Sequence, residues 1–547
     1  MIDSLRPMRT WGCIAAAALL IGCGPSSTDP LQPSQSAGQV ANSPAAPMTH
    51  FAAARVADQV SFGATPTLVD TIKAQGLNAW ISAQMALPVT QIVTPSHVIN
   101  YQRNTAAESV AYNFPPNEFI SLTLTAEDQL RLRVTWALMQ YVTISANKVE
   151  PYGQTEYFNL LQRHAFGNYA DLLREISIHP AMGRFLDNVE NRPTSTQCPN
   201  CAPNENYARE LMQLFALGVV KLNPDGSTMR DAKGRPIETY NQEDVEELAG
   251  ALTGWTFAPS ATPLPSTNWI NAGQLMVPES WAPLHDSNAK TVMGTAFPAG
   301  RNASQELDAV VAMLMQHPNI APFVSLRLIQ HLVMSNPSGP YIARVSAVFR
   351  NNGQGVAGDM KAVIRAVLTD AEARRGDQPG ADSTRFGKMR EPLLWQTALL
   401  RGLGCSDTLS WPNGSIVTPN TQRPFNPTSV FSFYMPTDRA PGSNLLAPEQ
   451  KLLAANEFTS RMGMKWALTF SGGASGCDVA ALTRAFSESP KSLIDQINAR
   501  WFRSAMPPTL RSNLEALALG QTWSTPEDAA LTLSLYSLSS PFFGVIK

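Results

Sequence analysis

The chain has 547 residues, enough for one large buried core or for two domains. Its 41 Lys and Arg residues nearly balance 43 Asp and Glu residues, and no basic stripe carries interleaved aromatic residues, so we exclude a nucleic-acid-binding protein. The 42 prolines indicate many loops between the elements.

A targeting segment opens the chain. Arg6 and Arg9 precede an apolar run, Trp11–Ile21, that is too short to cross a bilayer. The run leads into L-I-G-C, which resembles the bacterial lipobox. Residues 1–22 are therefore predicted to be a signal peptide, with Cys23 as the lipidated first residue of the mature chain. The alternative is an ordinary secretory signal with a chance cysteine.

The predicted anchor also indicates a location. Several acyl chains on Cys23 would hold the protein stably on a membrane. By resemblance to other lipoproteins, Gly24 in place of Asp after the lipidated Cys favours the outer membrane of a Gram-negative bacterium. Residues 23–50 are rich in Pro, Ser, Ala and Gln and are expected to form a flexible tether.

Four cysteines remain once the signal peptide is removed and Cys23 is lipidated. An even number in an oxidising compartment predicts two disulfides, and of the three pairings we favour Cys198–Cys201 and Cys405–Cys477. The C-P-N-C motif also suits a redox centre. It lies in a Pro/Thr/Ser loop with no strand before it, which favours a structural bridge. A zinc site would need a second C-x-x-C or a nearby His pair.

Apolar spacing beyond residue 50 is mostly helical and predicts an all-α fold with long loops. The polar stretch Asp370–Thr384 is expected to separate an N-terminal helical lobe, residues 51–370, from a C-terminal helical lobe, residues 385–547. The predicted helices cover Phe51–Phe62, Pro66–Gln75, Leu77–Met85, Glu127–Ile144, Tyr157–His164, Tyr169–Ile178, Ala181–Val189, Ser304–Gln316, Ile320–Met334, Tyr341–Arg350, Met360–Thr369, Phe386–Leu403, Pro448–Thr469, Val479–Phe486, Pro490–Phe502, Leu510–Leu519 and Pro526–Ser539.

The stretch Ala202–Trp255 holds the densest polar clusters. It predicts two further helices, each of which opens on polar residues and then becomes apolar. Between them, the turn signals N-P-D-G and A-K-G-R-P in Leu222–Tyr240 predict a small β-hairpin arm. The Pro-rich stretch Ala258–Pro283 follows, and loops of this length in compact domains are usually functional or disordered.

Six blocks carry a family resemblance. They are R-H-A-F-G-N-Y-A-D-L-L-R-E-I-S-I-H-P-A-M-G-R-F-L-D-N (Arg163–Asn188), P-N-E-N-Y-A-R-E-L (Pro203–Leu211), E-D-V-E-E-L-A-G-A-L-T-G-W (Glu243–Trp255), H-D-S-N-A-K-T-V-M-G (His285–Gly294), P-F-N-P-T-S-V-F-S-F-Y-M-P (Pro424–Pro436) and S-L-S-S-P-F-F (Ser537–Phe543). These blocks resemble the family called domain of unknown function 1800. The resemblance implies a bacterial, predominantly secreted protein of unassigned mechanism. It also implies a partner, because a second secreted family similar to sulfatases and alkaline phosphatases often accompanies this one.

The match runs roughly from Phe51 to Phe543. This chain departs from the family pattern in its C-x-x-C insertion and at Gly250, where an Arg is common. The missing Arg weakens any argument for an anionic ligand at that position.

The first motif helix places Glu205 and Arg209 four residues apart, where they can pair, beside a polar stripe that includes Asn206 and Glu210. Asn204 suits an N-cap, and a surface ion pair beside that cap is the alternative to a site. In the second helix, a capping box with Asn241 is the leading explanation for Asp244.

After the Pro-rich loop come His285, Asp286 and Lys290. Adjacent His and Asp side chains diverge, so they cannot form a relay, but each can contribute to a site; a loop anchor is the alternative. We take as candidate catalytic residues Glu205, Glu210, Asp244, His285 and Asp286, and as candidate binding residues Asn204, Asn206, Arg209 and Lys290.

Two functions fit these residues. The first is a carboxylate-based hydrolase or lyase that acts on cell-envelope or extracellular polysaccharide, since glycoside hydrolysis needs two carboxyl groups, one kept protonated by burial. The second is a non-catalytic envelope scaffold or binding module that works with the sulfatase-like partner. No motif requires a cofactor or predicts a metal site, although a carboxylate-and-His cluster can hold a divalent cation. No serine hydrolase, zincin, Walker A or dinucleotide motif is present.

Overall fold

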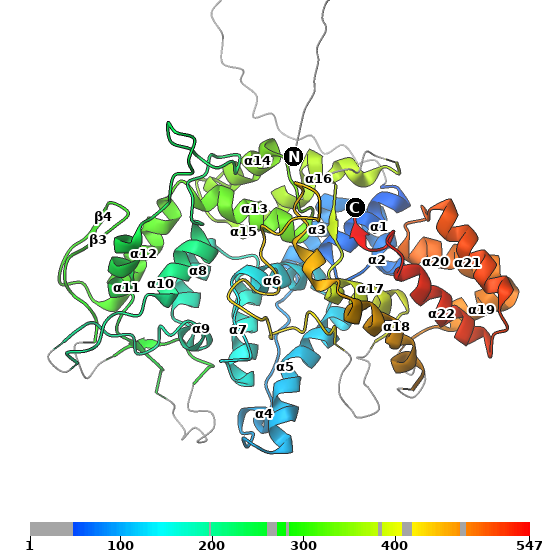
Figure 1. Ribbon diagram of the computed structural model, residues 1–547, viewed down its shortest axis with the longest axis horizontal. Coiled ribbons are helices and arrows are strands. Elements are labelled where there is room, and N and C mark those ends of the chain that lie inside the picture. The colour runs from blue at the N-terminus through cyan, green and yellow to red at the C-terminus, as the bar shows by residue number, and fades with distance from the viewer. Residues whose placement is uncertain are drawn as a thin grey trace, which may run out of the picture. The chain divides into compact units, whose positions relative to one another are not determined.

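Helices dominate the protein, and the predicted all-α class is confirmed (Figure 1). A computed structural model describes residues 48–195, 198–259, 271–279, 284–380, 386–406, 418–470 and 477–547. These residues belong to one compact unit, Ala46–Lys547. Cys23, the signal peptide and nearly all of the predicted tether lie outside the described residues, so those predictions stay predictions.

The helices of the first half begin at the residues that sequence capping rules favour. Thr65 accepts from the Leu68 N–H before Pro66 opens α2, and Asn168 caps α8 in the same way. The elements are α1 (His50–Val60), α2 (Pro66–Gln75), α3 (Leu77–Ala86), α4 (Ser96–Ile99), α5 (Ala106–Thr125), α6 (Gln129–Tyr141), α7 (Pro151–His164), α8 (Tyr169–Ser177), α9 (Pro180–Phe185), α10 (Asn206–Glu210), the π-helix η1 (Leu211–Ala216) and α11 (Gln242–Ala251).

The second half continues with helices joined by short connections. They are α12 (Ala303–Gln316), α13 (Ile320–Leu332), α14 (Gly339–Arg350), α15 (Met360–Thr369), α16 (Ala371–Arg374), the 3₁₀ turn η2 (Arg375–Asp377), α17 (Pro392–Gly402), the 3₁₀ turn η3 (Pro448–Leu452), α18 (Ala455–Phe470), α19 (Ala480–Glu488), α20 (Pro490–Trp501), α21 (Pro508–Gly520) and α22 (Pro526–Leu538).

One long helix, α5, was not predicted from the sequence. Pro115 and Pro116 lie inside α5, where proline normally ends a helix. Both prolines are buried, as are Phe119 and Ile120 on the same helix. Tertiary packing therefore keeps the segment helical against its local preference.

Three antiparallel pairs of short strands complete the fold. They are β1 (Trp255–Thr256) with β2 (Val277–Pro278), β3 (Lys290–Val292) with β4 (Thr295–Phe297), and β5 (Lys388–Met389) with β6 (Val545–Ile546). The predicted arm Leu222–Tyr240 contains isolated bridges rather than continuous strands, and its two turns lie at the predicted signals.

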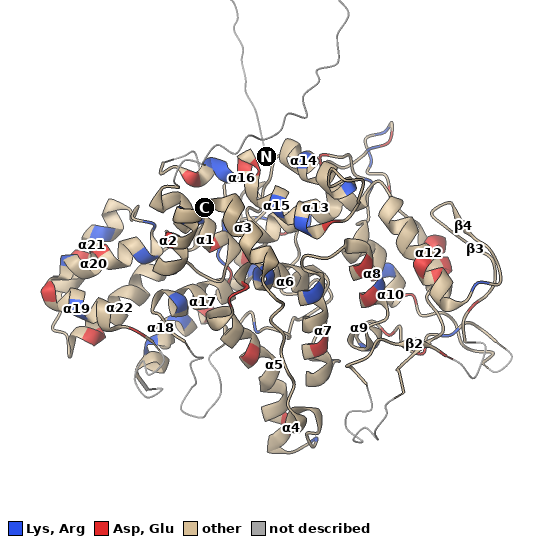
Figure 2. Cartoon of the chain, turned by 180° about the vertical axis from the view of Figure 1, so that it is seen from behind, with Lys and Arg blue, Asp and Glu red and all other residues tan. Residues whose placement is uncertain are grey.

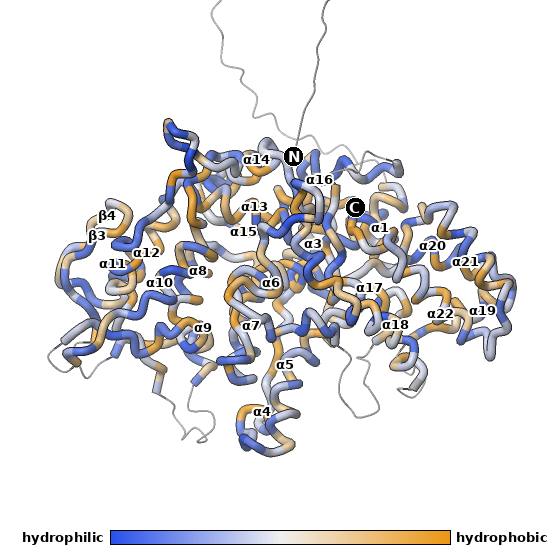
Figure 3. Tube along the Cα trace, viewed as in Figure 1, coloured by the Kyte–Doolittle hydropathy of each residue, from blue (hydrophilic) through white to orange (hydrophobic). Residues whose placement is uncertain are grey.

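Buried side chains form one large core and smaller ones. The largest draws on residues between Ala53 and Ala373, and the second on residues between Trp395 and Phe543. A third core, with Phe62 and Leu394, contains residues from both parts. The predicted division into two lobes stays a prediction. In Figure 3, hydrophobic and hydrophilic residues alternate along these helices, as amphipathic packing requires.

The motif elements gather at one end of the compact unit. Figure 1 shows α8, α10, α11, α12 and the β3–β4 hairpin together there, while α19–α22 lie at the other end. Figure 2 shows the chain from behind, with acidic residues on α8, α10 and α12 at the end that carries the motif elements.

Candidate functional site

The first motif helix changes its winding directly after Glu210. α10 ends at Glu210 and continues as the π-helix η1, in which the Leu217 N–H donates to the carbonyl of Met212 at 2.8 Å. π-Helical turns are rare and frequently occur at functional sites. The change from α- to π-helix at Glu210 therefore marks this residue and its neighbours as a candidate functional site.

A half-exposed polar ladder connects α10 to the start of α11. Arg209 donates to Glu205 at 2.7 Å and to the side-chain oxygen of Gln242 at 3.0 Å. The Gln242 amide donates in turn to Glu205 at 2.8 Å and to Glu246 at 3.0 Å. The predicted Glu205–Arg209 pair is thus present, and it holds the two motif helices together.

Glu210 follows Arg209 on α10 but lies in a different environment. The residue is only 8% exposed, and its Oε2 has no hydrogen-bond partner among the described residues. Burial raises the pKa of its carboxyl, and the nearby Arg209 opposes that shift only in part. Glu210 therefore combines a raised pKa with a buried oxygen that makes no hydrogen bond in the described part of the chain.

Tyr240 lines an open pocket beside the start of α11. Its buried hydroxyl has no hydrogen-bond partner in the described part of the chain. Burial raises the Tyr240 pKa to about 12, while the charges of Arg209 and Glu210 act on it in opposite directions.

The pocket lies between the arm and the start of α11. It has a volume of about 600 Å³ and is lined by Asp231, Arg235, Pro236, Ile237, Glu238, Thr239, Tyr240, Asn241 and Asp244. Asp231 pairs with Arg235 at 2.8 Å, whereas Glu238 is exposed and its carboxylate has no hydrogen bond or ion pair among the residues that the structure describes. Sequence reasoning missed Glu238 and Tyr240, because turn signals alone do not say which arm residues face a pocket.

Asp244 is fully engaged by the backbone. It forms the expected capping box with Asn241, each side chain accepting from the other's N–H at 2.9 Å. Its second oxygen accepts from the Met293 N–H at 2.6 Å. Met293 and Gly294 both have positive φ, as a type I′ hairpin turn requires, so Asp244 fastens the β3–β4 turn onto α11.

His285, Asp286 and Lys290 form a second group at the other end of α11. His285 Nδ1 lies 3.0 Å from the Thr253 carbonyl and must donate there, while its Nε2 lies 3.4 Å from Glu306 Oε2. The Lys290 ammonium contacts the same carboxylate at 3.1 Å and donates to the carbonyls of Asp286 and Asn288. Glu306, which is fully buried, is the centre of this group and was not predicted.

Two glycines make room for this second group. A Cβ at Gly250 would lie 3.0 Å from Asp286 Oδ2 and 3.1 Å from Lys290 Cε. At Gly254, with φ +88°, a Cβ would lie 2.8 Å from the Cβ of His285. The Gly250 departure noted in the sequence thus allows α11 to approach the Asp286–Lys290 segment closely.

Asn204 and Asn206 make their contacts away from this pocket. Asn204 exchanges hydrogen bonds with Asn191, and Asn206 donates to Asp187 at 3.3 Å. Asp187, which has φ +58° and pairs with Lys148 at 2.9 Å, lines an open polar groove of about 740 Å³. Its other lining residues are Arg103, Asn104, Glu108, Tyr112, Asn147, Lys148, Glu150, Arg184 and Val189.

The structure thus divides the predicted residues by position. Glu205, Arg209, Glu210 and Asp244 lie around the start of α11, and His285, Asp286 and Lys290 lie at its end. A helix of ten residues is about 15 Å long, which separates the two groups. In the described ranges, no cluster of three or more His, Cys, Asp or Glu side chains is arranged to hold a metal ion.

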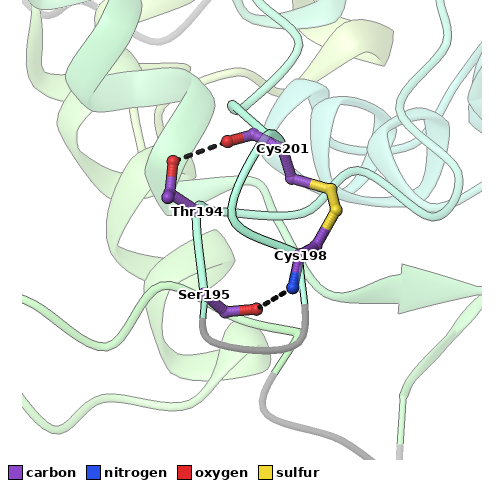
Figure 4. The surroundings of a disulfide bond; sticks show 4 residues. All are labelled: Thr194, Ser195, Cys198 and Cys201. Atoms are coloured by element: carbon purple, nitrogen blue, oxygen red, sulfur yellow. Dashed lines mark hydrogen bonds between the residues drawn. A yellow bond between two sulfur atoms is a disulfide. The ribbon is translucent and has the colours of Figure 1, made fainter.

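Both predicted disulfides are present. Cys198 bonds to Cys201, and Cys405 bonds to Cys477 across 72 residues. Figure 4 shows the first bridge, where the Cys198 N–H donates to the Ser195 hydroxyl at 3.1 Å and the Thr194 hydroxyl donates to the Cys201 carbonyl at 2.5 Å. This bridge closes the loop that leads into α10.

No single helix of the described chain has the length and apolarity of a membrane span. Only together do α12 and α13 meet those criteria, and the two are bent by 77° at a short break.

The fold and these groups define a mostly helical protein with a π-helix, a polar pocket at the start of α11 and two disulfides. Within that class, the chain belongs to the family described as Protein of unknown function (DUF1800), whose pattern its residues 55–545 match. No curated protein and no solved structure matches the chain.

Proposed function

We propose that this protein is a carboxylate-based hydrolase or lyase that acts on cell-envelope or extracellular polysaccharide, with Glu210 as the proton donor. The observation that carries the proposal is the buried Glu210 carboxyl, whose pKa is raised and whose Oε2 has no partner among the described residues. A glycosidase acid needs this environment, because burial keeps the carboxyl protonated near neutral pH.

The second carboxylate of such a mechanism is assigned to Glu238. Of the three carboxylates that line the pocket, Asp231 pairs with Arg235 and Asp244 accepts two backbone N–H groups. Glu238 also lines the pocket, and its carboxylate has no ion pair in the described part of the chain. In the proposed reaction Glu210 gives its proton to the leaving glycosidic oxygen, while Glu238 serves as the base that activates water or as the nucleophile.

The surroundings of α10 suit a polymeric substrate. Asn206 contacts the wall of the 740 Å³ groove through Asp187, and Glu205 contacts Gln242 beside the 600 Å³ pocket. α10 thus lies between two open hollows lined with charged and amide groups. Sugar hydroxyls pair readily with such groups, so a glycan chain that passes over α10 would have partners on both sides.

We further propose that the chain is lipid-anchored through Cys23 and exposed to an extracytoplasmic compartment, at the outer membrane of a Gram-negative bacterium. Two disulfides support an oxidising compartment, because they rarely persist in a reducing cytosol.

The second candidate function is a non-catalytic scaffold that works with a sulfatase-like secreted partner. The group at the end of α11 favours it: Lys290 pairs with the buried Glu306 at 3.1 Å and lies 3.8 Å from the partly exposed Asp286, and such charge pairing rigidifies a surface rather than opening a reaction site.

Activity screening of the mature chain against envelope polysaccharides, with and without a chelator, separates the two candidates. Glu210→Gln and Glu238→Gln should each abolish the turnover that the screen detects. Glu243→Gln, at an exposed position in the first turn of α11, is the matched control and should leave turnover unchanged. Polysaccharide turnover that survives both test substitutions would refute the assignment of these carboxylates.

A further inference from the structure

A cavity far along the chain from the motif helices combines arginines with aromatic walls. It has a volume of about 390 Å³, within the usual range for small-molecule sites. Its lining comes from the start of α1, from the segment around β5, from the residues after α20 and from Pro541–Lys547. The last segment includes the P-F-F end of a block quoted above, which the proposed polysaccharide activity does not use.

Two arginines in this cavity share one carboxylate oxygen. Arg390 and Arg503 lie 3.1 and 2.8 Å from Asp58 Oδ2. Burial acts to raise the Asp58 pKa, but the two guanidinium groups lower it below its ordinary value. The nearby carboxylate of Asp377 is already paired with Arg55 at 2.8 Å. Two guanidinium groups against one carboxylate leave one positive charge uncompensated by Asp58.

The Arg503 guanidinium does not use all of its N–H donors. Its side chain is 11% exposed, and its Nε is buried without a hydrogen-bond partner among the described residues. A buried charged donor without a partner is costly unless something else satisfies it. An oxyanion in the cavity would accept from the exposed part of this guanidinium and compensate its charge.

The backbone holds Arg503 in an unusual conformation. Arg503 and Ser504 have φ of +59° and +62°, a region that side chains other than glycine seldom adopt. Hydrogen bonds from the Ser504 and Met506 N–H groups to Asn498 fix the turn. Strained residues of this kind persist where the surrounding structure enforces them, often at binding sites.

The walls are suited to a flat apolar group. The Arg390 guanidinium lies 4.0 Å from the ring centroid of Phe543, and Arg503 lies 5.9 Å from that of Phe51. Phe502 and Phe543 pack with ring centroids 5.9 Å apart. Phe542, which also lines the cavity, is 52% exposed and leaves aromatic surface in reach of a ligand.

We propose that this cavity binds a small molecule with one oxyanion on an aromatic ring, such as an aromatic carboxylate, sulfonate or phosphate monoester. The oxyanion accepts from the exposed part of the Arg503 guanidinium, and the ring lies against the half-exposed Phe542. This site is independent of the proposed polysaccharide site, because it shares no residue with it.

Calorimetric titration of the full chain tests the site. The probes are benzoate, benzenesulfonate and phenyl phosphate, with benzyl alcohol as the neutral ring and inorganic phosphate as the anion without a ring. We expect one saturable site for at least one aromatic anion, at least tenfold weaker binding of both single-feature probes, and weaker binding at high salt. Equal binding of benzyl alcohol, or of inorganic phosphate, would overturn the proposal.

Three variants test whether the aromatic anion binds in this cavity. Arg503→Gln should weaken the aromatic anion at least tenfold, as expected for a lost charged hydrogen bond. Phe542→Ala, at a half-exposed position, should weaken it without unfolding the protein. Arg484→Gln removes an exposed arginine of α19 outside the cavity and should have no effect. Unchanged affinity in both Arg503→Gln and Phe542→Ala would place the ligand elsewhere.

Discussion

Lys290 and Glu306 form a buried ion pair that joins the β3–β4 hairpin to α12. Their charged atoms lie 3.1 Å apart, and the side chains are 2% and 0% exposed. His285 faces the same carboxylate. Removing one member of such a pair leaves a buried charge without compensation, which typically costs about 3–5 kcal/mol.

Lys290→Met should therefore lower the free energy of unfolding by about 3–5 kcal/mol. Asp308→Asn on the same helix is the control, since its pair with Arg174 is exposed and should contribute about 0–1 kcal/mol. Urea denaturation of both variants decides the point. A loss of less than 1 kcal/mol in Lys290→Met would show that the pair is not the anchor of the hairpin.

Asp244→Ala should cost about 1–3 kcal/mol, because it removes an N-cap partner and the acceptor of the Met293 N–H. Hydrogen exchange should accelerate most at Met293. Glu243→Ala, one residue earlier and exposed, should change stability by only a few tenths of that amount. If Met293 exchanges at the same rate in Asp244→Ala, the hairpin is held by something other than Asp244.

The Cys405–Cys477 bridge should stabilise the fold far more than the Cys198–Cys201 bridge. The first closes a loop of 72 residues and the second a loop of three, and longer loops lose more entropy on cross-linking. Replacing Cys405 and Cys477 by Ser should cost about 2–5 kcal/mol. Replacing Cys198 and Cys201 should cost markedly less in the same thermal melt; equal losses would contradict the loop argument.

Features that depend on interactions within one helix could be predicted from the sequence, whereas features that depend on tertiary packing could not. The Asn241–Asp244 capping box and the Glu205–Arg209 pair depend on spacing within one helix, so both could be predicted. α5 could not, because its two internal prolines are compensated by buried contacts. Glu306, Glu238 and Tyr240 reach the polar groups only through tertiary packing of α12 and the arm. The separation of Glu210 from His285 likewise depends on how α11 lies between them.

Cys23→Ala should release a soluble or uncleaved protein, because the proposed acyl chains provide the membrane anchor. Membrane fractionation and the mass of the mature chain give the readout. Unaltered fractionation with an unaltered mature mass would refute lipidation at this cysteine.

Burial of Glu210 predicts a specific pH dependence of stability. Its folded-state pKa is raised, so the stability that its protonated form contributes is complete below the ordinary value of 4.5 and is lost as pH rises through the raised pKa. Glu210→Gln keeps the shape without the ionisation. The variant should therefore lose less stability than the wild type across that interval in a series of urea melts. Parallel pH profiles would contradict a raised Glu210 pKa.

Turnover and melting temperature of Glu210→Gln, measured together at neutral pH on the polysaccharide that the screen identifies, test the central proposal most directly. A catalytic acid contributes typically about 10²–10⁴-fold to rate, so turnover should fall by that factor. The melting temperature should stay level or rise, because the variant folds without having to protonate a carboxyl that is ionised in the unfolded chain. Retained turnover, or a loss of stability that accounts for the loss of activity, would contradict the assignment of Glu210 as the proton donor.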